Sequence, residues 1–237
     1  DRRQRQMCIR DRIQNVIDRE TDLLRMMETQ MQALPSNDSK EKTLLEEWNL
    51  SITPVNNEKE LRQIKRHMGH SADCFSKAFR VKNSNRDNAF WNYYDKHNYH
   101  KEDIHYWYHG SRNMNCLSIL HNGLILNPKA PKVGHMFGYG IYLAPKAKKS
   151  IGYTSLNGSF WVHGTSDTAY LFVMKTVYKS PYHVYTWTSG MKSLTKSRIS
   201  PHDAVFAHAG TSLRNDEVVI FDDAQVTLQY IIELKQQ

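Results

Sequence analysis

Apolar positions near the N-terminus recur at the spacing of an amphipathic helix. They are Ile13, Val16, Ile17, Leu23, Leu24, Met27, Met31 and Leu34. Pro35 cannot continue a helix, so the helix is expected to end there, before a polar linker and a short helix over residues 42–50. This pattern predicts a helical arm and linker over residues 1–50 and a larger domain over residues 51–237.

In the larger domain, short apolar runs predict strands that alternate with helices. The expected strands cover residues 52–55, 75–81, 106–108, 137–144, 169–177, 182–187, 217–221 and 226–234. The expected helices cover residues 58–68, the aromatic segment around Phe90–Tyr94, the segment from Asn113 or Asn115 to Gly123, and residues 145–153. Residues 189–214 are predicted to form a long, irregular, basic loop. With few parallel crossovers, this order indicates an antiparallel-rich α+β fold.

Composition narrows the class of protein. The 237 residues include 40% hydrophobic residues, and no apolar run approaches the roughly 20 residues that cross a membrane. The chain starts at Asp1 without a methionine or a signal peptide, so we expect a fragment. We assign no function to the first 12 residues, because their CIRDR string resembles translated sequencing-adapter sequence. Cys8, Cys74 and Cys116 are widely spaced, which indicates reduced thiols in an intracellular protein, cytoplasmic, nuclear or nucleoid-associated, without a metal site.

The formal net charge is +8 at pH 7. A basic protein attracts polyanions, and both a nucleic acid and the pyrophosphate of a dinucleotide satisfy that description. Charge alone does not choose between these ligands and a merely solvated cationic surface.

The candidate chemistry lies mainly between residues 106 and 153. His109, Gly110 and Ser111 follow an aromatic strand, without one conventional pair of nucleophile and base. Such strand ends indicate a pocket for a flat polar ring and its sugar. Ser150 and Tyr153 are three residues apart, so on a helix they share one face. Farther along, Asp216 and Glu217 precede a β-branched strand, and strand alternation allows only one of the two to enter a site.

The ordered segments HGSR, MFGYGIYLA, KKSIGY and NDEVVIFDDAQVTLQYIIELK resemble the donor site and closing strands of the poly(ADP-ribose) polymerases. The resemblance covers residues 52–235 and is to the H-Y-E type of the diphtheria-toxin-like ADP-ribosyltransferase superfamily. It implies the ADP-ribosyltransferase fold, with the N-terminal arm as a remnant of a regulatory helical domain. It also implies an enzyme that takes NAD+ as co-substrate, needs no metal, and transfers ADP-ribose to an acceptor, expected to be protein, with release of nicotinamide and elongation to poly(ADP-ribose).

The resemblance also implies roles for individual residues. Glu217 is expected to be catalytic, with His109 and Tyr142 completing the H-Y-E set. The NAD+-binding residues are expected to be His109, Gly110, Ser111, Asn115, Tyr142, Lys149, Ser150 and Tyr153. Among them, Gly110 and Ser150 are expected to hold the carboxamide, Tyr153 to stack on the ring, and His109 to bind the adenosine ribose.

The acceptor side is expected to include Met136, Asn215 and the basic residues Lys192, Lys196 and Arg198. Polymerising members of the family often carry an aromatic residue where this chain has Asn215, which puts elongation in doubt but not NAD+ cleavage. Mono-ADP-ribosyl transfer is therefore one alternative. An RNA 2′-phosphotransferase-like enzyme is a second, disfavoured by the H-Y-E set. A non-catalytic nucleic-acid-binding module is a third, disfavoured by Glu217 but kept open by the basic charge. Nucleic acid could bind the basic surface or domains upstream, and no membrane partner is expected.

Overall fold

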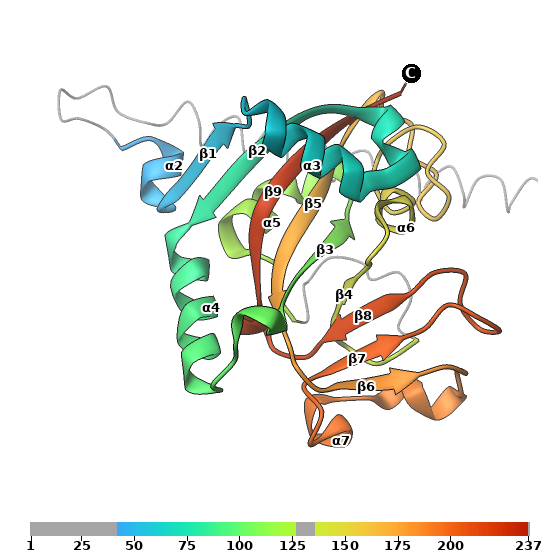
Figure 1. The fold of residues 1–237 in the computed structure, drawn as a ribbon. Helices are drawn as coiled ribbons and strands as arrows, with labels where there is room; N and C mark the ends of the chain where they lie inside the picture. The colour runs from blue at the N-terminus through green and yellow to red at the C-terminus, as the bar shows by residue number, and fades with distance from the viewer. Residues whose placement is uncertain (1–41, 127–135, 237) are drawn as a thin grey trace, which may run out of the picture. The chain divides into compact units, whose positions relative to one another are not determined.

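The computed structural model describes residues 42–126 and 136–236, which contain two sheets (Figure 1). One sheet has the order β1-β2-β9-β5-β3, with bounds Leu50–Pro54, Phe75–Asn83, Val226–Lys235, Thr168–Val177 and Ile104–Gly110. The other has the order β4-β8-β7-β6, with bounds Ile141–Leu143, Glu217–Ile220, Ala204–Ala207 and Pro181–Val184. Within these sheets only β6 and β7 pair in parallel. The predicted antiparallel-rich α+β fold is confirmed.

Six α-helices occur in the part of the chain that the structure describes. They are α2 (Leu44–Glu47), α3 (Glu58–Met68), α4 (Ser84–Lys96), α5 (Cys116–Asn122), α6 (Ala147–Ile151) and α7 (Lys196–Ile199). The prediction for α3 matches both ends, because Asn57 accepts a hydrogen bond from the Glu60 amide at its start and Gly69, with φ 58°, follows its last residue. No helix among the described residues is long and apolar enough to cross a membrane.

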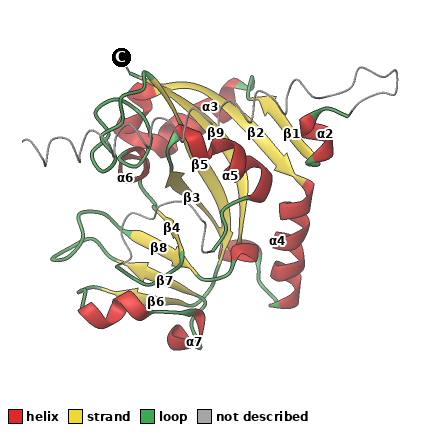
Figure 2. Cartoon of the chain, turned by 180° about the vertical axis from the view of Figure 1, so that it is seen from behind, coloured by secondary structure: helices red, strands yellow, loops and turns green. Residues whose placement is uncertain are grey.

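Helices α3 and α5 cover opposite faces of the five-stranded sheet, as the two opposite views show (Figure 2). Successive side chains of β5 point to opposite faces of the sheet and pack into two different cores. Phe172 and Met174 belong to the core that α5 joins, whereas Leu171 belongs to the core that α3 joins. All three side chains are fully buried. Burial on both faces fixes the register of this sheet, because a slip of one residue would exchange the two cores.

The two sheets meet at the end of β3. Tyr108 and Ala144 form an antiparallel bridge in which each amide donates to the carbonyl of the other at 2.9 Å. His109 and Gly110 follow Tyr108 directly, while Tyr142 lies two residues before Ala144. The bridge therefore brings the predicted donor-site residues of β3 next to β4.

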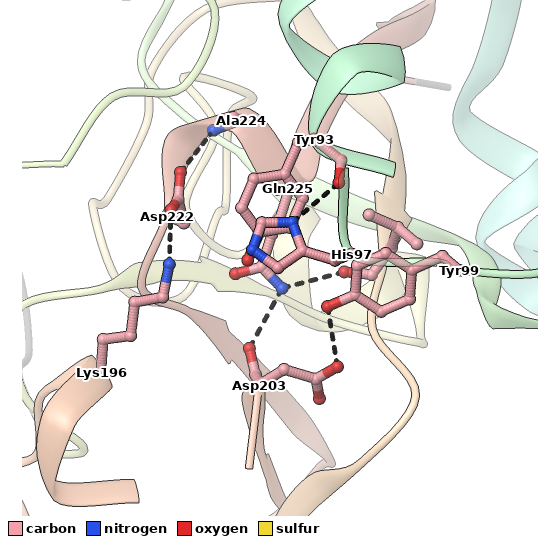
Figure 3. A network of polar contacts seen from close by, with 9 residues as sticks. Tyr93, His97, Tyr99, Lys196, Asp203, Asp222, Ala224 and Gln225 are labelled. Carbon is pink, nitrogen blue, oxygen red and sulfur yellow. Dashed lines mark hydrogen bonds and ion pairs between the residues drawn. The ribbon is translucent and has the colours of Figure 1, made fainter. Parts of the chain in front are cut away.

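A second joint is buried at the opposite end of the strands (Figure 3). The Gln225 side chain, 1% exposed, donates from Nε2 to the carbonyl oxygens of Val177 and Asp203 at 3.0 and 3.1 Å. The Tyr99 hydroxyl donates to Asp203 Oδ2 at 2.9 Å. Burial and the neighbouring Asp203 carboxylate raise the pKa of Tyr99, so this hydroxyl stays protonated. These bonds join β5 to the loop before β7.

Residues 189–214 correct the prediction of one long irregular loop. They contain the 3₁₀ helix Ser189–Ser193, helix α7 and strand β7. Strand β7 has four residues and forms because β6 and β8 pair with it on its two sides. The strand predicted over residues 137–144 is too long, since β4 covers only Ile141–Leu143. The helix predicted over residues 42–50 is also too long, since Leu50 already belongs to β1. The helix predicted over residues 13–34 lies outside the described residues.

Candidate active site

His109 lies at the end of β3 with its ring fixed against β4. Its Nδ1 is 3.0 Å from the Tyr142 carbonyl oxygen. Because a carbonyl only accepts, Nδ1 carries the hydrogen, and Nε2 of the neutral ring is left as an acceptor. Burial lowers the pKa of His109, and the bond to Tyr142 opposes that shift. A neutral imidazole with this tautomer can accept a hydrogen bond from a hydroxyl, for example that of a ribose.

The Tyr142 hydroxyl is held in both directions by the turn that precedes β4. It accepts from the Phe137 amide at 2.9 Å and donates to the Gly138 carbonyl at 2.8 Å. Burial raises the pKa of Tyr142 to about 12, so the hydroxyl is neutral at ordinary pH. Gly138 has φ +83°, and a Cβ there would lie 2.0 Å from the Leu194 carbonyl oxygen. The turn that fixes Tyr142 therefore requires glycine.

Glu217 is the first residue of β8 and is only 8% exposed. Val219 pairs with Tyr142 across β4 and β8, so Glu217, two residues earlier, shares a sheet face with Tyr142. Its carboxylate forms an ion pair with the ammonium of Lys149 from α6. Burial lowers the pKa of Lys149 to about 8, while Asp216 acts in the opposite direction. The site thus holds a buried carboxylate with one cation beside it.

Asp216 has a different position from its neighbour. Its Oδ1 accepts a hydrogen bond from the Ala209 amide at 2.7 Å. This bond occupies Asp216 in the loop between β7 and β8, whereas Glu217 turns toward Lys149. The structure therefore separates the two acids in the way that strand alternation predicts.

Helix α6 approaches β3 so closely that Gly110 leaves no space for a side chain. A Cβ on Gly110 would lie 1.7 Å from the Ser150 carbonyl oxygen. The buried Ser150 hydroxyl donates to the Tyr108 carbonyl at 3.0 Å. Gly110 and Ser150, predicted from the sequence as partners at one carboxamide, are thus in direct contact.

Tyr153 stacks on an aromatic residue that the sequence analysis missed. The rings of Tyr153 and Trp161 have centroids 5.8 Å apart and planes at 19°. Phe160 meets the edge of Trp161 at 4.7 Å, and both Phe160 and Trp161 are exposed. The only signal in the sequence was an aromatic pair inside a segment otherwise rich in serine and glycine. Trp161 therefore joins the candidate ring-binding residues.

Ser111 and Asn115 are also brought together. The Asn115 side chain donates from Nδ2 to the Ser111 hydroxyl at 2.9 Å, at the short 3₁₀ helix Asn113–Asn115 before α5. Both side chains are half-buried. The predicted adenosine-side pair is thus a local polar contact close to His109 in the chain.

The predicted acceptor-side residues do not form one group. Met136 accepts from Trp187 Nε1 through its carbonyl at 2.7 Å, and Lys192 lies 5.6 Å from the centre of the same indole. Arg198 bonds to the Ser193 hydroxyl, and Asn215 is half-buried in the loop before Glu217.

Lys196 is instead engaged at the second joint between the sheets. It donates to Asp222 at 2.6 Å and lies 5.3 Å from the centre of the Tyr93 ring (Figure 3). These contacts direct its ammonium to Asp222 and Tyr93.

Across residues 42–126 and 136–236, no group of three or more His, Cys, Asp or Glu side chains is placed to hold a metal ion.

Comparison with known proteins identifies similar sequences. The family model described as "Poly(ADP-ribose) polymerase catalytic domain" matches residues 58–236. Poly [ADP-ribose] polymerase of Drosophila melanogaster is 31% identical over 147 residues, which cover 54% of this chain and 15% of the fly protein. Poly [ADP-ribose] polymerase 1 of Gallus gallus is 31% identical over 153 residues, 54% of this chain and 14% of the relative.

A plant relative extends the match along the chain. Poly [ADP-ribose] polymerase 2 of Arabidopsis thaliana is 25% identical over 225 residues, 80% of this chain and 34% of the relative. The chain thus spans a small part of the length of the curated relatives that it matches.

Proposed function

The chain belongs to the poly(ADP-ribose) polymerase family, and from this premise we propose that it transfers ADP-ribose from NAD+ to an acceptor protein with release of nicotinamide. The observation that carries the proposal is the buried carboxylate of Glu217 on the sheet face that it shares with Tyr142, next to the strand end that holds His109.

The reaction requires negative charge at the ribose of NAD+. Nicotinamide leaves as a neutral group because its ring nitrogen is already cationic in NAD+, so no general acid is required. The ribose develops oxocarbenium character as the bond breaks, as in glycoside hydrolysis. A carboxylate fixed beside that carbon stabilises the transition state more than the ground state. We assign this part to Glu217, which also accepts a hydrogen bond from the attacking acceptor hydroxyl.

Binding of NAD+ is assigned to the surrounding strand ends. The neutral His109 ring accepts a hydrogen bond from a ribose hydroxyl through Nε2, and Ser111 and Asn115 line the adenosine side. Backbone groups of Gly110 and the Ser150 hydroxyl hold the carboxamide. The close approach of Gly110 to Ser150 supports this assignment. The Ser150 hydroxyl donates to the Tyr108 carbonyl, and we assign to it a turn away from that carbonyl when it donates to the carboxamide.

The nicotinamide ring is assigned to the aromatic residues. Tyr153 provides a stacking face, and Tyr142, with its hydroxyl fixed by Phe137 and Gly138, provides the opposite wall. Lys149 balances the charge of Glu217 while no substrate is bound, because a buried carboxylate without a partner would cost several kcal/mol.

Product length is a separate part of the proposal. Glu217 allows an ADP-ribose hydroxyl to be the acceptor and hence allows elongation, whereas Asn215 offers no aromatic face to the growing product. We propose single or short additions of ADP-ribose onto protein. The test incubates the purified chain and a mixture of candidate acceptor proteins with NAD+ labelled in the adenylate, followed by gel separation. Discrete labelled protein bands and released nicotinamide support the proposal, and a long smear shifts it to polymer synthesis. Absence of both label transfer and nicotinamide release contradicts it.

A further inference from the structure

A surface pocket of about 510 Å³ lies between α4 and the strands β3 and β5. Its lining residues are Trp91 and Tyr94 of α4, Lys101 of the 3₁₀ helix Lys101–Asp103, Ile104 and Tyr106 of β3, and Lys175 of β5. Tyr106 and Lys175 are direct partners in the β3–β5 register. By strand alternation the Tyr106 side chain leaves β3 on the face opposite to His109. The pocket is therefore separate from the candidate active site.

The aromatic walls of the pocket are accessible and held in place. Trp91 is 41% exposed and Tyr106 is 47% exposed. The Trp91 ring meets the buried Phe90 at 5.2 Å and 85°, and Tyr94 at 5.2 Å and 75°. Because Phe90 is fully buried in the core, its contact anchors the indole, while much of Trp91 stays exposed. An anchored, exposed ring offers a stacking face at small entropic cost.

The charges of the pocket select against a cationic ligand. Lys175 Nζ lies 5.1 Å from the centre of the Trp91 ring, so the protein's own ammonium already takes the cation–π position. Lys101 adds a second, exposed ammonium. Asp87 acts on Lys175 from α4 but is not among the lining residues. Two ammonium groups among aromatic faces suit a ligand that is both flat and anionic.

We propose that this pocket binds a nucleotide unit, with the base stacked on Trp91 or Tyr106 and the phosphate at Lys101 and Lys175. Bases stack on exposed aromatic side chains in proteins that bind single strands without sequence preference, while lysines follow the phosphates. The same chemistry is offered by a free mononucleotide and by one unit of a single-stranded nucleic acid. The inference does not depend on the ADP-ribosyl transfer proposed above, because none of its residues belongs to that site.

The test measures binding of a labelled single-stranded oligo(dA) to the full chain by fluorescence anisotropy. Trp91→Ala is expected to weaken binding about 10-fold, as loss of one stacked base commonly does. Lys101→Gln is expected to weaken it about threefold and to flatten its dependence on salt. Lys82→Gln is the matched control, because it removes the same charge from an exposed position on β2 that does not line the pocket. It is expected to bind like the parent.

Competition identifies the source of the nucleotide. If AMP displaces the oligo(dA) at an AMP concentration close to that of the oligo(dA), the site takes single nucleotides. If only another single strand competes, the site takes a nucleic-acid strand. Equal weakening by Lys82→Gln and Lys101→Gln would overturn the proposal in favour of general surface charge, as would competition by inorganic phosphate alone. Tyr106→Ala serves if Trp91→Ala does not fold, and parent-like binding by Tyr106→Ala and Lys101→Gln together would also overturn it. Nicotinamide release by Lys101→Gln should equal that of the parent.

Discussion

The ammonium of Lys149 contacts the carboxylate of Glu217, and their side chains are only 12% and 11% exposed. An ion pair removed from water in this way gives little net stability, because desolvation offsets most of the attraction. It does fix the carboxylate at one place on β8, opposite the helix that carries Ser150. A substrate hydroxyl that reaches Glu217 must share the carboxylate with Lys149 or displace Lys149 from it. The ion pair thus sets the position of the Glu217 carboxylate and the charge around it before substrate binds.

The contact between Gly110 and Ser150 gives the most direct structural prediction. In Gly110→Ala the new Cβ would overlap the Ser150 carbonyl oxygen, so α6 must move away from β3. Overpacking of this kind costs about 1–3 kcal/mol in the free energy of unfolding. Urea denaturation measures that loss, and calorimetry with a benzamide-type ligand should show weakened binding.

Gly190→Ala is the matched control, since its Cβ would meet no atom within 4 Å. It should keep both the stability and the ligand affinity of the parent. If Gly110→Ala behaved like Gly190→Ala, the close approach of α6 would not matter for the site.

Local pattern was sufficient for several elements of the fold. Helix α3 was predicted with its bounds because Leu61, Ile64 and Met68 share one face. The Asn57 cap and Gly69 agree with those bounds in the structure. Strand β9 was recognised from a β-branched run that is buried on both faces of its sheet. In both elements, propensity, periodicity and end signals agree.

The remaining features depend on pairing that a local pattern does not contain. Strand β7 was missed because its four residues are too short for a periodic signal and are stabilised by β6 and β8 from elsewhere in the chain. Lys196 looked like a free loop cation, but its contact with Asp222 arises from tertiary packing. Trp161 was missed for the same reason. The individual site roles stay predictions.

Tyr153 should contribute to ring binding. Tyr153→Ala removes the ring that stacks on Trp161 and is assigned to nicotinamide, so it should weaken a benzamide-type ligand by about 1 kcal/mol or more. Isothermal calorimetry gives this value directly. Tyr185→Ala, an exposed aromatic that stacks on His208, provides the comparison and should leave affinity unchanged. Equal affinities for all three proteins would remove Tyr153 from the site.

His109 should make stability depend on pH in the acidic range. Its pKa in the folded protein is lowered from 6.5, so below pH 6.5 the unfolded chain binds a proton more readily than the folded chain. This stability is present above pH 6.5 and is lost as the pH falls toward the folded pKa, at up to about 1.4 kcal/mol per pH unit. Urea midpoints between pH 5 and 7 should fall less steeply for His109→Gln than for the parent.

His67→Gln tests whether any histidine would give this effect. His67 is exposed on α3, so its replacement measures the effect of losing a histidine outside the core. A parent-like slope in His109→Gln would mean that its ring titrates as freely in the folded chain as in the unfolded one.

The basic residues near β6 and β7 should divide into two groups. Lys192→Gln with Arg198→Gln should weaken transfer to acidic acceptors, most clearly at low salt, without changing NAD+ affinity. Lys196→Gln should instead lower stability by less than about 1 kcal/mol, because its bond to Asp222 is partly exposed. Labelling assays and denaturation separate these effects. A large loss of NAD+ binding in the double variant would place those residues on the donor side.

Glu217→Gln should separate binding from chemistry. Glutamine has nearly the same shape and can still bind a ribose hydroxyl and Lys149, so NAD+ affinity should change little. It has no charge to stabilise the oxocarbenium-like transition state, and loss of one such contact costs roughly 3 kcal/mol, or about a hundredfold in rate. Transfer onto ADP-ribose should fall further than NAD+ hydrolysis, because the carboxylate serves both the donor and the attacking hydroxyl. Asp216→Asn is the control, because it removes the same charge from the neighbouring residue. The Asn side chain keeps an acceptor for the Ala209 amide, so this variant should retain most of the activity. Nicotinamide release and product length, measured for all three proteins, decide the matter: if Glu217→Gln kept the parent's rate while Asp216→Asn lost it, the catalytic carboxylate would be Asp216.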